Sequence, residues 1–194
     1  MTRPGVWPRC GRPDGCHATE PRIRCVKDWL YRFHSVAVPE PRAKLGLSLY
    51  GAFGAALAVL VVGAIGSLSD APLLIAPLGA TALLLFAVPD SLMSQPRSVL
   101  VGHLVAVVAG IILARLIGPG WLAAAPAVFV SITLMIGLQS LHAPAGATAV
   151  LTALEPHEWS FIGLPVMAGA AAMLVLALIL HAFVPGRRYP ARWY

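Results

Sequence analysis

The stretch APLGATA at Ala76–Ala82 returns, with one substitution, as APAGATA at Ala143–Ala149, 67 positions further along the chain. Both copies lie within apolar segments, and both combine the helix-breaking residues Pro and Gly with a polar Thr. Apolar segments interrupted by Gly and Pro at corresponding places in two halves are typical of the binding site of a secondary transporter. The repeat therefore indicates a membrane protein built from two related halves.

The composition of the chain excludes an ordinary soluble domain. Of its 194 residues, 58% are hydrophobic and 11% are charged, whereas soluble domains carry about 25% charged residues. So few charges cannot cover a water-facing surface. We therefore expect an all-α integral membrane protein of one membrane domain, with the lipid bilayer as its surroundings.

The positive charge lies at the two ends of the chain. Nine of the 14 Lys and Arg residues precede Leu45 and three follow the last apolar segment, so the net charge of +6 is concentrated there. Basic residues beside membrane segments predict the cytoplasmic side, so both termini are expected in the cytoplasm. Because no folded basic module or RNA-binding motif accompanies the charge, nucleic-acid binding is not expected.

Three regions follow from this distribution. They are a basic, largely disordered leader with an interfacial segment at 1–44, a transmembrane domain at 45–185 and a basic cytoplasmic tail at 186–194. All three cysteines lie in the leader, without a Cys-x-x-Cys pair. We therefore expect neither a metal site nor a cofactor.

The transmembrane domain contains six apolar segments. They are expected at about residues 47–68, 72–88, 98–117, 121–138, 141–154 and 161–184, with the helix of the second segment starting at Gly79. A shift of 67 positions brings the first three over the last three, so the repeat extends to whole segments. If all six cross the bilayer, the halves form an inverted repeat. In the alternative, four segments cross, and the second and fifth are short helices broken by Gly and Pro.

A set of motifs spans most of the membrane domain. They are APLGATALLLF at Ala76–Phe86, QPR at Gln95–Arg97, GH at Gly102–His103 and LHAPAGATA at Leu141–Ala149. In this order they resemble the HPP family of small integral membrane proteins. The His-Pro-Pro motif of the family corresponds here to His142-Ala143-Pro144, in which the middle Pro is replaced.

The resemblance to the HPP family implies a fold and a function. It implies four membrane spans, which favours a bundle of two pseudo-repeated halves with four full spans and two short helices. Plant and cyanobacterial members are implicated in nitrite transport, which implies a small inorganic anion as substrate. We therefore expect a transporter or channel for an anion such as nitrite, in the bacterial cytoplasmic (inner) membrane.

The two copies of the repeat supply the first candidate substrate-binding residues. They are Gly79, Ala80, Thr81, Gly146, Ala147 and Thr148. Each Gly-Ala-Thr phrase is expected to open a short helix after a Pro. A helix N-terminus offers an anion free N–H groups and about half a positive charge, and the Thr hydroxyls add donors. Helix packing is the alternative explanation, because tight crossings in membranes also use Gly, Ala and Thr.

Four further polar residues complete the candidate substrate site. They are Arg97, His103, Gln139 and His142. Histidine inside a membrane segment is a functional candidate, because burying it is costly, and its ring could couple proton and anion movement. Gln139 precedes His142 by three positions, so the two share a face if the helix continues. Arg97 begins a span, where it attracts anions or binds lipid phosphate.

Other classes of function have less support in the sequence. No nucleophile motif, phosphate-binding loop or metal-ligating His/Glu spacing appears in the apolar segments, so an enzyme is not expected. The competing hypothesis is a structural or sensory membrane protein whose repeats only pack helices. A homo-oligomer would help so small a domain to shield a polar path.

Overall fold

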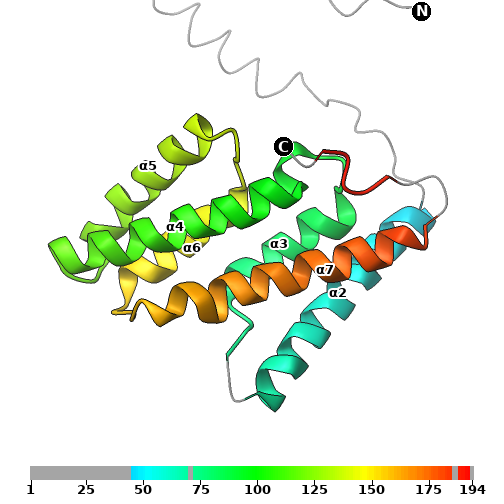
Figure 1. The fold of residues 1–194 in the computed structure, drawn as a ribbon, viewed down its shortest axis with the longest axis horizontal. Coiled ribbons are helices and arrows are strands. Elements are labelled where there is room, and N and C mark those ends of the chain that lie inside the picture. The colour runs from blue at the N-terminus through cyan, green and yellow to red at the C-terminus, as the bar shows by residue number, and fades with distance from the viewer. Residues whose placement is uncertain (1–44, 70–71, 185–187, 193–194) are drawn as a thin grey trace, which may run out of the picture. The chain divides into compact units, whose positions relative to one another are not determined.

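The computed structural model describes residues 45–69, 72–184 and 188–192, so the predicted leader and part of the predicted tail lie outside the described residues. Within these ranges every regular element is helical, which confirms the all-α class (Figure 1). The elements are α2 (Leu45–Leu68), α3 (Ala76–Ala87), the 3-10 turn η1 (Leu92–Ser94), α4 (Pro96–Ile117), α5 (Trp121–Gly137), α6 (Ala143–Leu154), the π-helical turn η2 (Ile162–Met167) and α7 (Ala168–Ala182).

Three of the described helices are long and apolar enough to cross a membrane. The candidate spans are Leu49–Leu68, Pro96–Ile117 and Ile162–Ala182, with mean hydropathies of 2.1, 2.4 and 2.4. Within an 18-residue window of each span, only 28%, 44% and 39% of the residues are buried inside the protein. Most of the apolar surface of these helices is therefore left for lipid, as expected of an integral membrane protein.

The fourth full span stays a prediction. α5 lies where it is predicted, but it has 17 residues and contains Pro126. At a rise of 1.5 Å per residue it is about 25 Å long, which is short of a hydrocarbon core of about 30 Å. The described chain therefore contains three helices of spanning length and three shorter apolar helices, α3, α5 and α6.

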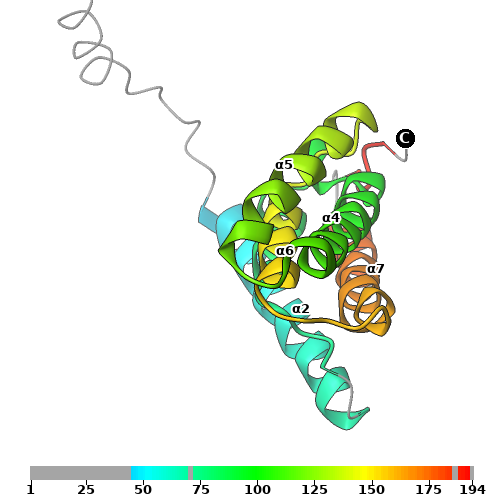
Figure 2. The same cartoon turned by 90° about the vertical axis from the view of Figure 1, so that its left-hand side faces the viewer.

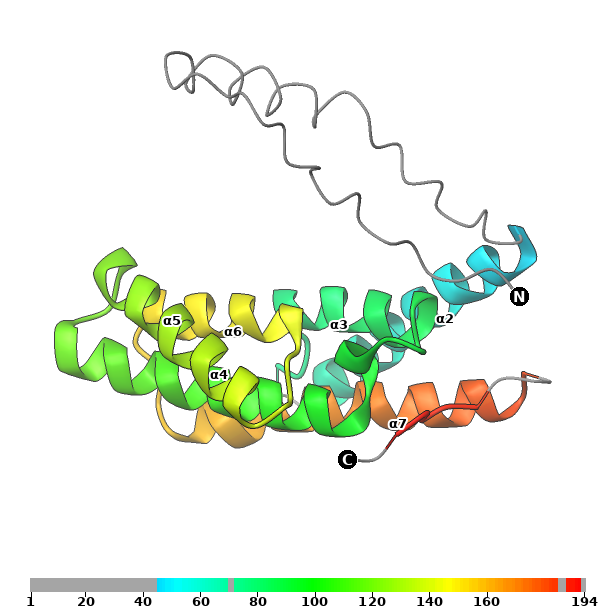
Figure 3. The same ribbon diagram turned by 90° about the horizontal axis from the view of Figure 1, so that it is seen from above.

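The short helices α3 and α6 hold the two copies of the repeated phrase. Each has 12 residues and begins with Ala-Pro, and their bounds differ by the same 67 positions at both ends. The helices lie end to end, with their N-termini facing each other and their C-termini pointing in opposite directions (Figures 1 and 3). The two copies of the phrase therefore meet inside the bundle.

The start of α3 differs from the prediction. The helix begins at Ala76 and not at Gly79, with Pro77 at its second position. Proline is accommodated there because a first-turn residue has no use for a helical N–H. Gly79 is thus the fourth residue of the helix, beyond the free N–H groups of the first turn.

Glycine permits two close approaches between long helices and the segments that precede the short ones. A Cβ added to Gly169 of α7 would lie 2.5 Å from the carbonyl oxygen of Leu73, and one added to Gly102 of α4 would lie 2.7 Å from the Cβ of His142. Real Cβ atoms essentially never come within 3.0 Å of other heavy atoms. Glycine at 102 therefore decides how closely His142 packs against α4.

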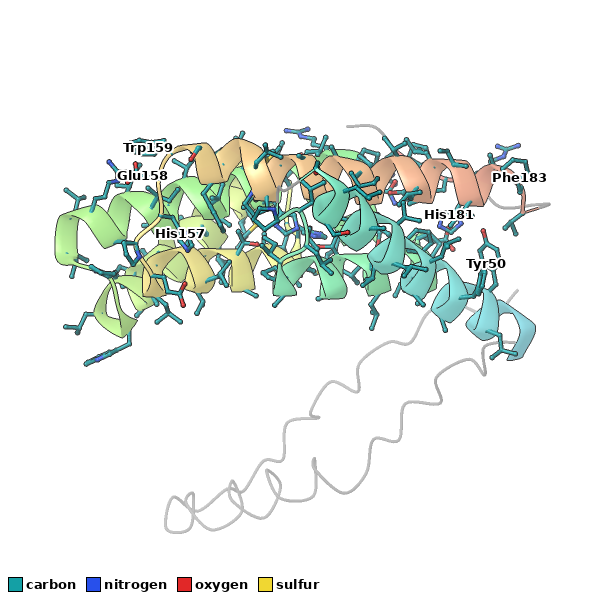
Figure 4. The ribbon with its side chains drawn as sticks, turned by 90° about the horizontal axis from the view of Figure 1, so that it is seen from below. Tyr50, His157, Glu158, Trp159, His181 and Phe183 are labelled. Carbon is teal, nitrogen blue, oxygen red and sulfur yellow. The ribbon has the colours of Figure 1, made fainter. Side chains whose placement is uncertain are left out.

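The two ends of the bundle each hold a group of aromatic and polar side chains. α4 contacts α5, α6 and α7, and seen along the bundle it lies between α6 and α7 (Figure 2). Tyr50, His181 and Phe183 lie at one end, and His157, Glu158 and Trp159 lie at the other (Figure 4). The N-termini of α3 and α6 meet between these ends (Figure 3).

Candidate functional site

Four buried side chains form a continuous line of hydrogen bonds. His103 of α4 contacts Thr81 of α3 through Nε2 (2.9 Å) and Thr148 of α6 through Nδ1 (2.9 Å). Thr81 also contacts Nε2 of His142 (3.0 Å), and Nδ1 of His142 lies 2.7 Å from the carbonyl oxygen of Met93. All four residues are 0% exposed. Together with the Met93 carbonyl they form the histidine–threonine line.

The Met93 carbonyl orients every proton of the line when both rings are neutral. A carbonyl only accepts, so Nδ1 of His142 carries a proton and Nε2 accepts the Thr81 hydroxyl proton. Thr81 then accepts from Nε2–H of His103, whose Nδ1 accepts from Thr148. The neutral line is therefore polarised in one direction, from Thr148 to Met93.

The histidine–threonine line joins the two copies of the repeated phrase. Thr81 belongs to the first copy and Thr148 to the second, and they bind opposite nitrogens of the His103 ring. The rings of His103 and His142 pack edge to face, with centroids 4.9 Å apart. The structure thus brings four of the predicted site residues into direct contact.

An open pocket of about 460 Å³ adjoins the Met93 end of the line. Its lining includes Met93, Arg97, Gln139 and Arg192. Arg97 donates to the carbonyl of Leu138 (2.9 Å) and is exposed. The pocket therefore places two positive charges beside the residue whose carbonyl binds His142.

Gln95 and Tyr189 hold the C-terminal segment against the rim of the pocket. Oε1 of Gln95 accepts the N–H groups of Ala191 and Arg192, both at 3.0 Å. The hydroxyl of Tyr189 donates to the carbonyl of Ser94 (2.7 Å), and burial raises the pKa of this hydroxyl, so it stays protonated at neutral pH. These bonds bring Arg192 to the pocket from the far end of the sequence.

Gln139 lies at the pocket in a strained turn and shares no helix face with His142, because α5 ends before it. Its φ is 51°, in the left-handed region that costs a non-glycine residue roughly 1–2 kcal/mol. The N–H of Ser140 bonds to the Met135 carbonyl (2.8 Å) and the N–H of Gln139 to the Ile136 carbonyl (3.0 Å). This Schellman arrangement usually places Gly where Gln139 stands.

Four predicted site residues lie away from the line. Gly79, Ala80 and Ala147 are exposed, and Gly146 is half-buried. No atom comes within 4 Å of a Cβ added to Gly79 or Gly146. These four residues are the fourth and fifth of their helices, where N–H groups bond within the helix. Their role as anion ligands stays a prediction.

Four residues of the site were not among the predicted ones: Met93, Gln95, Ser140 and Arg192. Met93 acts through its carbonyl, for which the sequence carries no signal. Gln95 belongs to the QPR motif, and a polar residue beside Pro at the start of an apolar helix is a signal that could have found it. Ser140 is fully buried, its hydroxyl has no hydrogen-bond partner among the described residues, and both of its chain neighbours line the pocket. Such a hydroxyl calls for a bound ion or water.

The line suits proton chemistry better than metal binding. In the described parts of the chain, no three His, Cys, Asp or Glu residues are grouped so that they could hold a metal ion. All four ring nitrogens of His103 and His142 are already in hydrogen bonds. What these rings can do is accept, hold or pass a proton.

Paired charges occupy the opposite end of the bundle. Arg115 bonds to Glu158 (3.3 Å), and its guanidinium lies 4.9 Å from the centre of the Trp159 ring. Arg115, His157 and Glu158 line a pocket of about 420 Å³. The positive charge is balanced there, whereas the residues that line the Arg97–Arg192 pocket include no acid.

The chain is similar to known membrane proteins over most of its length. Residues 40–190 match the family model described as the HPP transmembrane region. Two relatives from Dictyostelium discoideum, each named only as a transmembrane protein, are 39% and 36% identical in alignments of 129 residues that cover 62% of this chain. The match covers 45% and 42% of these relatives, so the chain spans less than half of their length. No solved structure matches the chain.

Proposed function

Because this chain belongs to the HPP family of integral membrane proteins, we propose that it is a transporter or channel for a small inorganic anion such as nitrite. The anion enters the Arg97–Arg192 pocket. The proposal rests on the position of this pocket beside the histidine–threonine line. Met93 lines the pocket, and the Met93 carbonyl binds His142. An anion there lies beside two arginines and beside the residue whose carbonyl binds the buried His142.

The chemistry of the pocket suits a small oxyanion. A guanidinium group presents parallel N–H donors that match two oxygens, as in nitrite. Arg97 and Arg192 supply two such groups, and the buried hydroxyl of Ser140, next in sequence to pocket residues, still needs a partner. With the basic ends of the chain in the cytoplasm, the pocket opens to that side.

The repeat supports the same function. We propose that α2–α4 and α5–α7 are two pseudo-repeated halves of opposite orientation. The N–H of Leu78 bonds to the Ile75 carbonyl (2.9 Å), and 67 positions later the N–H of Ala145 bonds to the His142 carbonyl (3.0 Å). α3 and α6 point in opposite directions (Figure 3). Inverted repeats whose broken helices meet near the membrane centre are a common plan of secondary transporters.

The two short helices also favour an anion electrostatically. Each helix N-terminus carries about half a positive charge. Because the N-termini of α3 and α6 face each other (Figure 1), these partial charges add between the two helices, which supply Thr81 and Thr148 of the line. An anion that leaves the Arg97–Arg192 pocket toward the line therefore meets a positive potential without a further fixed charge to trap it.

Nitrite uptake by proteoliposomes tests the proposal. Protein-free liposomes set the background, since neutral nitrous acid crosses bilayers unaided. We expect uptake that depends on the protein and that falls about tenfold in Arg97→Gln, because a charge-assisted hydrogen bond contributes about 1.5 kcal/mol. Arg115→Gln is the matched control. Arg115 is an exposed arginine of the same helix, but it lines the pocket that also includes His157 and Glu158.

A structural or sensory membrane protein is the competing function. The approach of Gly169 to the Leu73 carbonyl favours it, because such contacts serve helix packing alone. If folded protein conducts neither nitrite nor any other small anion, transport is overturned and the packing function is preferred. If uptake is equal in Arg97→Gln and Arg115→Gln, the pocket is the wrong site even though transport occurs.

A further inference from the structure

A row of buried polar side chains crosses the apolar core. The histidine–threonine line runs from the Met93 carbonyl to Thr148, and Thr152, one turn further along α6, donates to the Thr148 carbonyl (2.8 Å). Every side chain of this row is 0% exposed. Polar side chains at membrane depth are costly to bury, and they commonly mark the paths of ions or protons.

We propose that the histidine–threonine line conducts protons, and that each proton accompanies one anion. The inference rests on the proposed transport function, because the anion in the Arg97–Arg192 pocket is the charge that the proton meets. Hydroxyl and imidazole groups alternate along the line, in the order Thr148, His103, Thr81, His142. Each group accepts on one side and donates on the other, so it can take up one proton while it releases another.

A proton that arrives at Thr148 reaches His142 in three transfers. Thr148 keeps the new proton and passes its former one to Nδ1 of His103, which releases its Nε2 proton to the Thr81 oxygen. Thr81 passes its former hydroxyl proton to Nε2 of His142. Only O–H and N–H bonds break and form, one positive charge moves from Thr148 to His142, and no electron is transferred. The reverse sequence carries a proton from His142 to Thr148, which is the direction of an anion that enters from the pocket.

The Thr81 hydroxyl can reverse its role in the line, from donor to acceptor toward His142. In the neutral line its hydroxyl donates to His142. Once both nitrogens of His142 carry protons, Thr81 accepts from that ring, and its own proton can turn to Nε2 of His103 (2.9 Å) or to the carbonyl of Pro77 (3.3 Å). The Thr81 hydroxyl keeps a hydrogen-bond partner in either state, so the charged state does not leave it unpaired.

The described groups that face His142 include no carboxylate. They are Thr81 of α3, the Met93 carbonyl of η1, His103 of α4 and, across the adjoining pocket, Arg97 and Arg192. A protonated His142 therefore lacks a negative partner, and an anion in the pocket supplies one. Protonation of His142 and binding of the anion strengthen each other by the same factor.

Nitrite uptake and internal pH, measured in the same proteoliposomes, test the proton path. A pH-sensitive dye is enclosed, and a nitrite gradient is applied with equal pH on both sides. Wild-type protein is expected to acidify the interior by one proton per nitrite, above the background of protein-free liposomes. An acidic exterior is expected to accelerate uptake, and a protonophore to remove that acceleration.

Thr81→Val removes the hydroxyl that links the two rings while it preserves the side-chain shape. Whatever nitrite uptake this variant retains, we expect it to lose the acceleration by an acidic exterior, and Thr81→Ser to restore it. Thr133→Val is the matched control, because Thr133 is exposed on α5 and bonds to the Phe129 carbonyl (2.8 Å). If thermal unfolding shows that Thr81→Val does not fold, Thr148→Val interrupts the other end of the line.

The outcomes distinguish the proton path from transport itself. Nitrite uptake without acidification, or with full acceleration in Thr81→Val, overturns the proton path and leaves anion transport in place. Absence of uptake by wild-type protein of nitrite and of every other small anion overturns the proposed function. Proton influx driven by a potassium diffusion potential then decides the path: influx that Thr81→Val abolishes supports it, and absence of influx in wild-type protein overturns it.

Discussion

The segments that enter α3 and α6 share a backbone arrangement and differ in chemistry. We call the chain before α3, with Leu73, the first entrance and the chain before α6, with Ser140, the second. At the first entrance Gly169 of α7 lies against the Leu73 carbonyl. At the second, Gly102 of α4 lies against the Ser140 carbonyl, whose oxygen would be 3.4 Å from a Cβ added to Gly102. Each residue of one pair is 67 positions from its counterpart in the other. The approach of a long helix to the chain before a short helix therefore occurs twice, once beside an apolar residue and once beside a buried serine.

The next positions extend the contrast. Ile75 precedes α3 and packs against the apolar core, whereas His142 stands at the same place before α6 and forms two hydrogen bonds. His103 of α4 corresponds to Ala170 of α7, a fully buried core residue. One entrance therefore supplies packing and the other the polar site, and a Thr from each copy of the repeat bonds to His103.

Gly169→Ala breaks the apolar entrance and is expected to have the largest effect on stability. Its Cβ would lie 2.5 Å from both the Leu73 carbonyl oxygen and a methyl group of Leu78. Relief requires a backbone shift, so we expect a loss of about 1–3 kcal/mol and a lower Tm in detergent. Gly146→Ala is the control, with no atom within 4 Å of its Cβ. Equal Tm values for the two variants would contradict the close packing.

His142→Ile makes the second entrance resemble the first. The variant removes the partner of the Met93 carbonyl, so we expect a loss of about 1–2 kcal/mol of stability, and nitrite uptake at the level of protein-free liposomes. His157→Ile, at the opposite end of the bundle, is the control with the same change of side chain. Normal uptake by folded His142→Ile would show that the difference between the entrances has no part in transport.

Gln139→Gly tests whether the turn before the second entrance is strained. Glycine adopts a φ of 51° without strain, so we expect a gain of about 0.5–1 kcal/mol in the free energy of unfolding. We also expect slower nitrite uptake, since the pocket loses an amide. Higher stability with unchanged uptake would make Gln139 a turn residue alone, and lower stability would contradict the strained turn.

Glu158→Gln changes the end of the bundle far from both entrances and is expected to have the smallest effect. The side chains of Arg115 and Glu158 are 46% and 86% exposed, and such pairs contribute less than about 1 kcal/mol. We expect a Tm close to that of the wild type and normal uptake, with any difference removed by salt. A large loss of uptake would transfer the anion site to this end.

Much of the fold and part of the site could be predicted from the sequence. The membrane class follows from the scarcity of charges, and the places of the six helices follow from apolar runs ended by Pro and Gly. His103, His142, Thr81 and Thr148 stand out singly because each is a polar residue in or beside an apolar segment. The start of α3 was not predictable from Pro77, since Pro is compatible both with the first turn of a helix and with the chain before it.

Contacts within the site could not be predicted, because hydrogen bonds depend on direction and distance in space. Partners in the line are 22, 45 and 61 positions apart in sequence, and one acceptor is the backbone of Met93. Arg192 reaches the pocket through its N–H bond to Gln95, 97 positions away. The sequence around Gln95 and the sequence around Arg192 give no indication that these two residues pair.

From the linear sequence alone it follows that this protein lies in a membrane, that two short helices hold nearly the same seven-residue phrase and that polar residues accompany them. Hydrophobicity and helix breaking act over a few neighbouring residues, so a linear sequence carries these signals directly. Only the tertiary structure decided that both Thr residues meet one His103 ring, that His142 is fixed by a carbonyl and that Ile75 replaces it in the other half. These facts depend on how closely the helices approach one another. Gly102 and Gly169 allow that close approach, but their contacts are with residues far away in the sequence, so the local sequence does not show them.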